Sequence, residues 1–429
     1  MKPSRYNNFF PFQDHIVGYN ALANDYIFLT TDLHDLYTKT IIEDVNQLAE
    51  VHPDFWNLLV DKSFLVPKGT DELQQAKDLV SSIDKNPEHY GLIINPTMSC
   101  NFACWYCYES HIRNSNMSEL EIHKLLKHIA KKLDEGDIKQ FTLSWFGGEP
   151  LLQFKRVMVS ILEFVNHYIS EKNIEFTSNV TSNGLLITDE LLANCKRLGI
   201  VHFQITLDGH RNRHNQVRYI GSAKRGSYDV IVANIKLCLR AGVNVTCRIN
   251  LSKETFNEDL TKIIDDFSDL NDGERQLINF SFHQVWQDGT DLLSDTLDLV
   301  EEFKKHGLNT TFEMFNDFVR NSCYADKSNQ ATVNYNGDVF KCTARDFKTE
   351  NREGILLDDG TIEWNEKYFC RMDSKFKNQA CLTCRILPIC NGACTQRAIE
   401  NAGKEYCIYN FDEDKKTDVI RERLMYALA

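Results

Sequence analysis

Apolar strands alternate with amphipathic helices over residues 89 to about 315. Short apolar runs predict six strands, at 90–95, 140–146, 174–182, 202–207, 244–251 and 278–285. Apolar positions at helical spacing predict helices between them, at 117–133, 154–170, 189–198, 228–241 and 258–270. Strands that alternate with helices in this way pair in parallel and carry the helices outside. The region therefore predicts a partial (β/α)6 barrel, with its functional residues at the C-terminal ends of the strands.

The residues before this region predict a smaller module of short strands and helices. The pattern predicts strands at 25–31 and 63–67 and helices at 41–48, 53–60 and 70–83. Pro67 closes the second strand because proline cannot continue a ladder. Thr70 is expected to cap the last helix. Short strands followed by helices favour a winged-helix-like fold for this module.

The C-terminal region differs because its apolar periodicity fades and its turns multiply. Only residues 412–428 have helical spacing, whereas many of the cysteines fall in this region. A segment with little apolar periodicity and many thiols is expected to be held together by metal. We therefore expect domains at 1–88, 89–315 and 316–429, in an α/β fold whose TIM-like partial barrel lies between two other domains.

Length and charge narrow the class of protein. The 429 residues correspond to about three domains. The net charge of −13 argues against nucleic-acid binding, which needs a basic surface. The sequence has no apolar run of about 18 residues that would span a membrane, and its first residues lack the apolar core of a signal peptide. We expect a cytoplasmic protein with no nucleic-acid or membrane partner.

The chain contains 14 cysteines, and their spacing is not random. In a reducing compartment they are not expected to form structural disulfides. One tight group comprises Cys100, Cys104 and Cys107, and a second comprises Cys381, Cys384, Cys390, Cys394 and Cys407. Tight thiol groups in a cytosolic protein indicate metal binding.

The first group has the spacing C-x3-C-x2-C and follows the first predicted barrel strand directly. Three thiolates suit an iron–sulfur cluster with one open iron better than a closed zinc site, which takes four ligands. A zinc knuckle with a distant fourth ligand is the alternative.

This motif resembles that of the radical S-adenosylmethionine (SAM) superfamily, and further segments resemble the same family at later strand ends. Tyr106 fits the aromatic residue that the family places beside the adenine of SAM. Gly147-Gly148-Glu149 resembles the segment that binds the amino group of the SAM methionine. Glycines permit close backbone approach, and a carboxylate pairs with an ammonium group.

The resemblance implies further contacts to SAM from the next two strands. Ser182 and Asn183 match the family's polar contacts to the ribose and the carboxylate. Asp208 stands in a Thr-Leu-Asp-Gly segment similar to the related Ser-Leu-Asp-Gly. Arg218 is similar to an arginine that pairs with the methionine carboxylate, a task that suits guanidinium. For Asp208 and His214, turn and helix capping is the alternative. No residue is identified as catalytic in its own right.

The later cysteines resemble the SPASM domain, which holds two auxiliary iron–sulfur clusters in peptide-modifying radical SAM enzymes. The resemblance implies that Cys381, Cys384, Cys390 and Cys407 hold one auxiliary cluster, and that Cys323, Cys342 and Cys394 hold the other. The second set has only three cysteines, so either its cluster has an open iron or another residue closes it, with Cys370 the nearest candidate. Zinc is the alternative metal. Cys195, Cys238 and Cys247 are expected to be buried structural thiols.

Together these resemblances imply an oxidoreductase that matures a ribosomally synthesised peptide. Its cofactors would be SAM and three [4Fe-4S] clusters, one binding SAM and two auxiliary. Cleavage of SAM would give a 5′-deoxyadenosyl radical, which abstracts a hydrogen from a precursor peptide to install a thioether or carbon–carbon cross-link. The N-terminal module would bind the leader peptide, and a flavodoxin or ferredoxin would donate electrons.

Three alternative functions stay open. One is a protein oxidase like the anaerobic sulfatase maturases, which carry an aspartate directly after the cysteine that corresponds to Cys342. This chain has Thr343 there and Asp346 close by. The others are a peptide epimerase, and a zinc-stabilised binding scaffold that is not an enzyme.

Iron content tests the cluster assignment. We expect brown protein after anaerobic purification, with about twelve irons per chain if all three sites hold four-iron clusters. Metal analysis of the purified protein provides the measurement. Zinc in place of iron, in colourless protein, would contradict the assignment.

Overall fold

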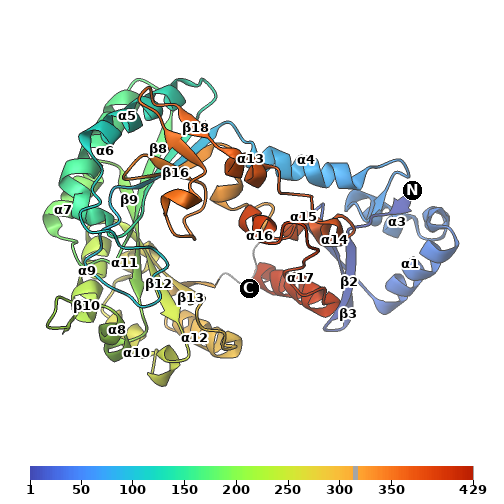
Figure 1. The fold of residues 1–429 in the computed structure, drawn as a ribbon. Coiled ribbons are helices and arrows are strands. Elements are labelled where there is room, and N and C mark those ends of the chain that lie inside the picture. The colour runs from blue at the N-terminus through green and yellow to red at the C-terminus, as the bar shows by residue number, and fades with distance from the viewer. Residues whose placement is uncertain (313–316, 429) are drawn as a thin grey trace. The chain divides into compact units, whose positions relative to one another are not determined.

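The computed structural model describes residues 1–312 and 317–428, which belong to two compact units (Figure 1). The first unit comprises Met1–Asn86, Phe315–Ser328 and Phe369–Ala429, and the second comprises Pro87–Met314 and Asn329–Tyr368. The region expected as a third domain is thus divided between the two units. The boundary predicted between residues 315 and 316 lies outside the described residues.

The second unit is built on one large, mostly parallel sheet in which eleven strands lie in the order β14-β13-β12-β9-β8-β7-β6-β15-β16-β17-β18. All neighbours from β14 to β15 pair in parallel, and the last three strands pair antiparallel. The strands are β6 (His89–Asn95), β7 (Gln140–Trp145), β8 (Glu175–Ser182), β9 (Ile200–Leu207), β12 (Asn244–Leu251), β13 (Ile278–Gln284), β14 (Asn309–Phe312), β15 (Gln330–Asn334), β16 (Asp338–Phe340), β17 (Gly354–Leu356) and β18 (Ile362–Trp364).

Helices connect these strands and cover the sheet on its outer side (Figure 1). They are α5 (Glu119–Asp134), α6 (Val159–Ile169), α7 (Asp189–Arg197), α8 (Arg211–Val217), α9 (Tyr228–Arg240), α10 (Lys262–Asp266), α11 (Asp272–Leu277) and α12 (Leu293–Lys305). Shorter elements are η2 (Pro150–Gln153), η3 (Phe154–Met158), η4 (Thr255–Asn257), η6 (Thr349–Asn351), β10 (Tyr219–Ile220) and β11 (Arg225–Gly226). The predicted α/β class is confirmed, and the six predicted strands are neighbours in the predicted order.

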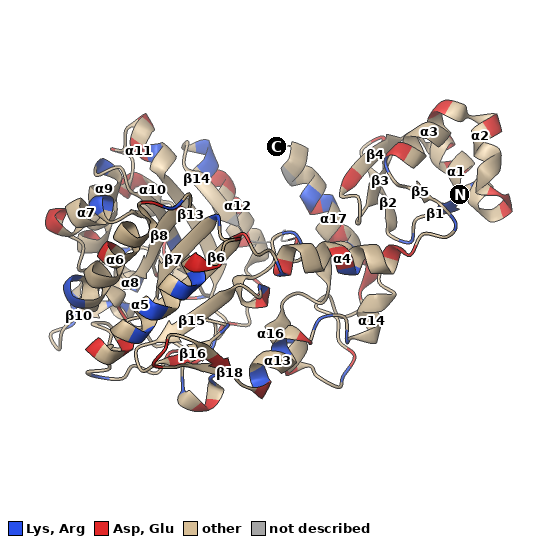
Figure 2. Cartoon of the chain, turned by 90° about the horizontal axis from the view of Figure 1, so that it is seen from above, with Lys and Arg blue, Asp and Glu red and all other residues tan. Residues whose placement is uncertain are grey.

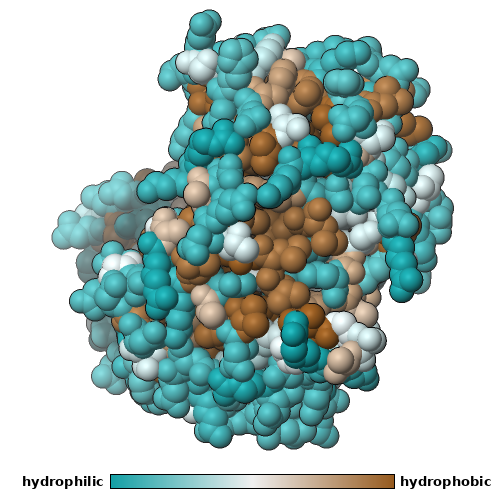
Figure 3. All heavy atoms as spheres, turned by 90° about the vertical axis from the view of Figure 1, so that its left-hand side faces the viewer, coloured by the Kyte–Doolittle hydropathy of each residue, from teal (hydrophilic) through white to brown (hydrophobic). Residues whose placement is uncertain are grey.

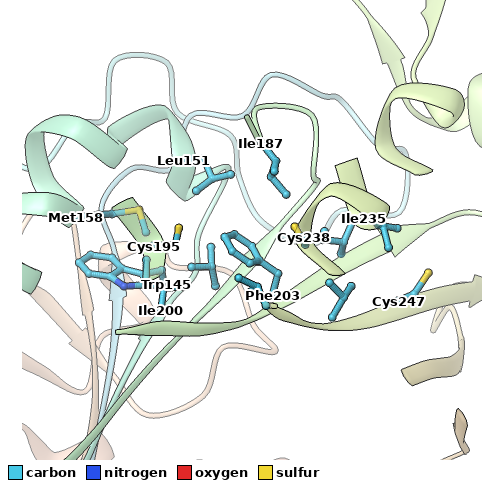
Figure 4. Packing of buried hydrophobic residues seen from close by; sticks show 14 of the residues in the cluster. Trp145, Leu151, Met158, Ile187, Cys195, Ile200, Phe203, Ile235, Cys238 and Cys247 are labelled. Carbon is cyan, nitrogen blue, oxygen red and sulfur yellow. The ribbon is translucent and has the colours of Figure 1, made fainter. Parts of the chain in front are cut away.

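The main hydrophobic core fills the space between this sheet and its helices. Figure 4 shows Trp145 of β7 and Phe203 of β9 among its members. Cys195, Cys238 and Cys247 are fully buried in the same core, so the prediction of three structural thiols is confirmed. A small thiol there packs as a hydrophobic side chain.

The first unit contains the N-terminal strands and most of the C-terminal cysteines. Its strands are β1 (Lys2–Pro3), β2 (Asn7–Phe12), β3 (His15–Asn20), β4 (Asp25–Leu29) and β5 (Leu65–Val66), and β2-β3-β4 form an antiparallel sheet. Its helices are α1 (Thr31–Glu43), η1 (Val45–Gln47), α2 (Leu48–Val51), α3 (Pro53–Asp61), α4 (Glu72–Asp84), η5 (Tyr324–Asp326), α14 (Gln379–Leu382), α15 (Leu387–Cys390), α16 (Thr395–Glu400) and α17 (Glu413–Leu428). The boundary between the units falls within α13 (Glu366–Met372).

One hydrophobic cluster joins the two ends of the chain within this unit. Phe10 of β2 and Tyr19 of β3 pack in the same cluster as Ile389 of α15 and Ile420 of α17. Cys390, which directly follows Ile389, is also a member. The N-terminal module and the cysteine-rich C-terminal segments therefore share one core, which the sequence pattern did not predict.

The predicted helix caps and strands agree with the structure in some places and differ from it in others. Ser118 caps α5 by accepting from the backbone N–H of Glu121. The last helix of the N-terminal module is capped by Asp71 instead of Thr70. Strands β2 and β3 were not predicted, and neither were β14 to β18. Strand β14 has four residues and β16, β17 and β18 have three each, which is too short for a clear alternating pattern.

The surface is mixed in charge and largely hydrophilic. Figure 2 shows that acidic and basic residues are interspersed along the helices. On the face drawn in Figure 3, hydrophilic side chains predominate and hydrophobic ones gather near the middle. Within the described part of the chain, no helix combines the length and the apolar character needed to cross a bilayer.

The shared core of the first unit generates a stability prediction. Ile420 is fully buried, and Ile420→Ala is expected to lower the free energy of unfolding of this unit by about 2–5 kcal/mol because it leaves a cavity. Ile42 on α1 is 80% exposed, so Ile42→Ala should stay within about 0.5 kcal/mol of the parent. Urea unfolding of the iron-free protein, followed by circular dichroism, provides the comparison. Equal effects of the two substitutions would contradict the shared core.

Candidate functional site

Three thiols lie on the loop that leaves the C-terminal end of β6. Cys100 and Cys104 are half-buried, and Cys107 is exposed. The loop folds back on itself, because the backbone N–H of Met98 donates to Ser115 Oγ at 2.9 Å and that of Ile112 donates to the Met98 carbonyl at 3.2 Å. The sequence therefore places the three predicted ligands on one ordered loop at the edge of the sheet where parallel strands present functional residues.

Two glycines let the next strand end pack directly against this loop. A Cβ on Gly147 would lie 2.7 Å from the Thr97 carbonyl oxygen, and one on Gly148 would lie 2.7 Å from the Ser99 carbonyl carbon. The backbone N–H of Gly148 donates to the Thr97 carbonyl at 3.1 Å, and that of Glu149 donates to the Ser99 carbonyl at 2.9 Å. The close approach expected of these glycines is thus made to the cysteine loop.

Glu149 is fully buried beside the end of β8. Its carboxylate accepts from the backbone N–H of Asn183 at 2.8 Å, from that of Leu151 at 3.0 Å and from Ser182 Oγ at 3.0 Å. Burial raises the pKa of Glu149 to about 7, although these donors act in the opposite direction. The structure therefore brings together the predicted residues Glu149, Ser182 and Asn183.

Asn183 also reaches the cysteine loop, since its Nδ2 donates to Asn101 Oδ1 at 2.6 Å. The three predicted groups from β6, β7 and β8 therefore form one continuous assembly.

A second assembly joins the aromatic residue of the cysteine loop to β9. Tyr106 Oη donates to Asp208 Oδ2 at 2.8 Å, and Arg218 Nη2 donates to Tyr106 Oη at 2.8 Å. Arg218 Nε also forms an ion pair with Asp208, and both side chains are buried. Burial alone would raise the pKa of Asp208, but the charge of Arg218 and the other donors keep it below its usual value.

His214 supports this second assembly from α8. It is fully buried, its Nδ1 accepts from the backbone N–H of Asp208 at 3.2 Å, and its Nε2 lies 3.0 Å from Ser227 Oγ. Burial lowers the pKa of His214 to about 3, so the ring is neutral near pH 7. His214 therefore orients the backbone beside Asp208.

Further polar residues lie at this edge of the sheet. Asn250 at the end of β12 donates from Nδ2 to Asp208 Oδ1 at 3.2 Å, and Arg248 Nε donates to Asn250 Oδ1 at 3.0 Å. His283 of β13 lies close enough for the charge of Arg248 to add to burial in lowering its pKa to about 4. These side chains extend the polar edge across β9, β12 and β13. His283 was missed, and its position near the end of β13 was the signal that could have identified it.

Asn95, the last residue of β6, is a further residue that was missed. Its side chain is fully buried, and neither Oδ1 nor Nδ2 has a hydrogen-bond partner among the described residues. The same holds for Nδ2 of Asn101. Buried amides are normally satisfied, so these atoms are where a polar ligand such as SAM would supply the missing partners.

Four other thiols line one cavity in the first unit. They are Cys381, Cys384, Cys390 and Cys407, the set that the resemblance assigned to one auxiliary cluster. About 360 Å³ of space outside the atoms, part of it open to solvent, lies among the lining residues. Burial raises the pKa of Cys381 to about 11 and that of Cys390 to about 12, so these thiols are protonated unless metal displaces the protons.

The remaining predicted ligands lie elsewhere. Cys323 precedes η5 and Cys394 precedes α16, both in the first unit, whereas Cys342 follows β16 in the second unit. Cys370 is exposed on α13.

The thiol sets have the ligand chemistry of soft metal sites. Soft thiolate ligands suit Zn²⁺, Cu(I) and iron–sulfur clusters, and a four-iron cluster distributes its thiolates over separate irons. Among the described side chains, no three His, Cys, Asp or Glu residues are arranged to hold one metal ion.

Comparison with known proteins agrees with this geometry. Residues 94–267 match the radical SAM superfamily. The radical SAM cyclopropyl synthase TigE of Paramaledivibacter caminithermalis is 20% identical over 396 residues, which cover 84% of this chain and 79% of TigE.

Two solved structures share the fold. The structure of anSMEcpe with bound AdoMet is 18% identical with a TM-score of 0.60, and the match covers 79% of this chain and 98% of that one. The structure of Streptococcus suis SuiB bound to precursor peptide SuiA is 16% identical with a TM-score of 0.54, and the match covers 94% of this chain and 98% of SuiB.

The fold and the site therefore define an α/β enzyme with a thiol-bearing loop at the end of its first barrel strand. The chain contains a radical SAM domain at residues 94–267, and its cofactors are SAM and [4Fe-4S].

The contact between the glycines and the cysteine loop can be tested at Gly148. Gly148→Ala forces a methyl group against the Ser99 carbonyl, so we expect about 1–3 kcal/mol of destabilisation and loss of the iron bound by this loop. Gly136→Ala is the matched control, because a Cβ there meets no atom within 4 Å. Iron per chain and the thermal unfolding midpoint are the measurements. Full iron content in the Gly148 variant would show that the contact is not needed.

Proposed function

We propose that this enzyme matures a ribosomally synthesised precursor peptide by installing a thioether or carbon–carbon cross-link. The observation that carries the proposal is the combination of the site at the sheet edge with a separate cavity lined by four thiols. Enzymes that only cleave SAM need the first site, whereas a second set of thiols provides for a further cluster. TigE is named as a cyclopropyl synthase, and SuiB was solved with a bound precursor peptide. Both relatives support the proposal of a peptide-modifying, bond-forming enzyme.

Each residue of the site is assigned the role that the chemistry of its side chain suits. Cys100, Cys104 and Cys107 would hold the cluster that supplies the electron for reductive cleavage of SAM. Tyr106, Gly147, Gly148, Glu149, Ser182, Asn183, Asp208 and Arg218 would contact SAM. Glu149 would accept from the methionine ammonium, which favours its ionised form over the protonated form that burial favours. Arg218, already oriented by Asp208 and Tyr106, is preorganised to donate to a carboxylate.

The four thiols of the first unit would hold an auxiliary cluster. Cys381, Cys384, Cys390 and Cys407 supply the four thiolates that a closed [4Fe-4S] cluster needs. Such a cluster can accept the electron that a substrate radical gives up when a new bond closes. We also propose that Cys323, Cys342 and Cys394 hold a second auxiliary cluster, as the resemblance to the SPASM domain implies.

The N-terminal module is proposed to bind the leader of the precursor. Within the described residues, β2 and β4 each pair with β3 alone, so each leaves one edge open. An extended peptide can add a strand to such an edge. A flavodoxin or ferredoxin is proposed as the electron donor.

The neighbourhood of Asp346 favours a cross-linking enzyme over a protein oxidase. Asp346 accepts from the backbone N–H of Ser110 at 3.0 Å and from its Oγ at 2.7 Å, and Lys348 lies 3.3 Å away. Burial acts to raise the pKa of Asp346, but these partners keep it below its usual value. A carboxylate held in this way is a weak general base.

Turnover with a precursor peptide tests the proposal. The reconstituted enzyme is incubated anaerobically with SAM, a reductant and each precursor peptide encoded beside its gene, and the products are analysed by mass spectrometry. We expect a product that has lost two hydrogens, together with 5′-deoxyadenosine. Cys104→Ala should form neither product, because it removes one cluster thiolate.

The outcomes also separate the alternatives. Deuterium uptake from heavy water without a change in bonding would identify an epimerase. Unchanged peptide after incubation with every neighbouring precursor would contradict the proposed function.

A further inference from the structure

A buried lysine lies between two buried carboxylates in the first unit. Lys375 Nζ is 2.6 Å from Asp84 Oδ2 and 3.1 Å from Asp326 Oδ2. The side chains of Lys375 and Asp84 are each 11% exposed, and that of Asp326 is fully buried. One ammonium group therefore compensates two carboxylates that belong to distant parts of the chain.

Asp326 connects the two segments that carry Cys323 and Cys394. Its backbone N–H donates to the Cys323 carbonyl at 2.9 Å, which closes the turn after that cysteine. Its Oδ1 accepts from the backbone N–H of Thr395 at 3.0 Å and from Thr395 Oγ1 at 2.6 Å. Because Thr395 directly follows Cys394, one carboxylate fixes the backbone beside both thiols.

Asp84 connects the same segment to the N-terminal module. It is the last residue of α4, and its carbonyl accepts from the backbone N–H of Ser328 at 2.7 Å. Ser322, which directly precedes Cys323, donates from Oγ to Asp84 Oδ1. Lys375 therefore joins the end of α4 to the turn that carries Cys323.

Arg371 adds a second cationic contact to the Cys394 segment. Its Nη1 donates to Thr395 Oγ1 at 3.2 Å, and its Nη2 donates to Gln396 Oε1 at 2.7 Å. These bonds hold the start of α16, and Thr395 Oγ1 is shared between Arg371 and Asp326. The Cys394 segment is thus held from α13 as well as from the Cys323 turn.

We propose that Lys375 is a positioning residue for the auxiliary iron–sulfur site that includes Cys323 and Cys394. By holding Asp326 and Asp84 together, it places the backbone of both thiols before iron binds. Buried ion pairs of this kind serve geometric specificity more than stability. The inference rests on the proposed function, since it uses the assignment of these thiols to an auxiliary cluster.

Removing the ammonium group should uncouple the two thiol segments. In Lys375→Met, Asp84 and Asp326 would face each other without a counter-charge, and one or both would move or take up a proton. Lys375→Arg keeps the charge and is expected to restore most of the function. Lys377→Met is the matched control, because Lys377 is 65% exposed and pairs with the exposed Asp373 one turn away.

The experiment measures iron per chain and the electron paramagnetic resonance spectrum after anaerobic reconstitution and reduction. We expect wild-type protein, Lys377→Met and Lys375→Arg to hold about twelve irons. Lys375→Met should hold about eight, with the signal of one cluster lost and the other signals unchanged. Asp326→Asn removes the charge at nearly constant volume and should reduce the same signal.

The outcomes separate this inference from the proposed function. Wild-type protein with only about four irons would overturn both, because no auxiliary cluster would then exist. Twelve irons and unchanged spectra in both Lys375→Met and Asp326→Asn would overturn the positioning role alone. If Lys375→Met does not fold, as judged by circular dichroism, Asp326→Asn decides the question by the same two readouts.

Discussion

The close contact between two backbone segments is the constraint on which the SAM site depends. The Gly147-Gly148 turn can approach the cysteine loop only because no Cβ stands between them. That approach allows Glu149 to donate its backbone N–H to the loop while its carboxylate turns toward the end of β8. One contact thus aligns the loop with its thiols, the buried carboxylate and the polar residues of the next strand.

The remaining site residues are ordered by charge and burial. Asp208 and Arg218 compensate each other away from water, and Tyr106 bonds to both. A neutral His214 orients the backbone of Asp208. Because the groups hold one another, they lose little freedom when a ligand binds, which is the physical meaning of preorganisation.

The sequence revealed the parts of this site that are carried by local pattern. The spacing of Cys100, Cys104 and Cys107, the pair of glycines and the strand order are all readable along the chain. Asp326 was missed because its importance comes from partners far away in sequence. Asn95 was missed because burial of an amide without a hydrogen-bond partner is visible only in the structure. The same reason explains the missed core of the first unit, in which Phe10 and Ile420 meet. The pattern of residues along the chain shows periodicity and motifs, but it does not show which distant segments share a core.

That shared core has a consequence for how such enzymes diversify. A peptide-binding module that folded alone could be exchanged between maturases without affecting the rest of the enzyme. Here Tyr19 and Phe10 pack in the cluster that contains Cys390, and Asp84 closes an ion-pair network beside Cys323. Exchange of the proposed recognition module would therefore disturb the packing around the proposed cluster ligands. On that proposal, recognition and redox chemistry in this chain must change together, through compensating substitutions on both sides of one core.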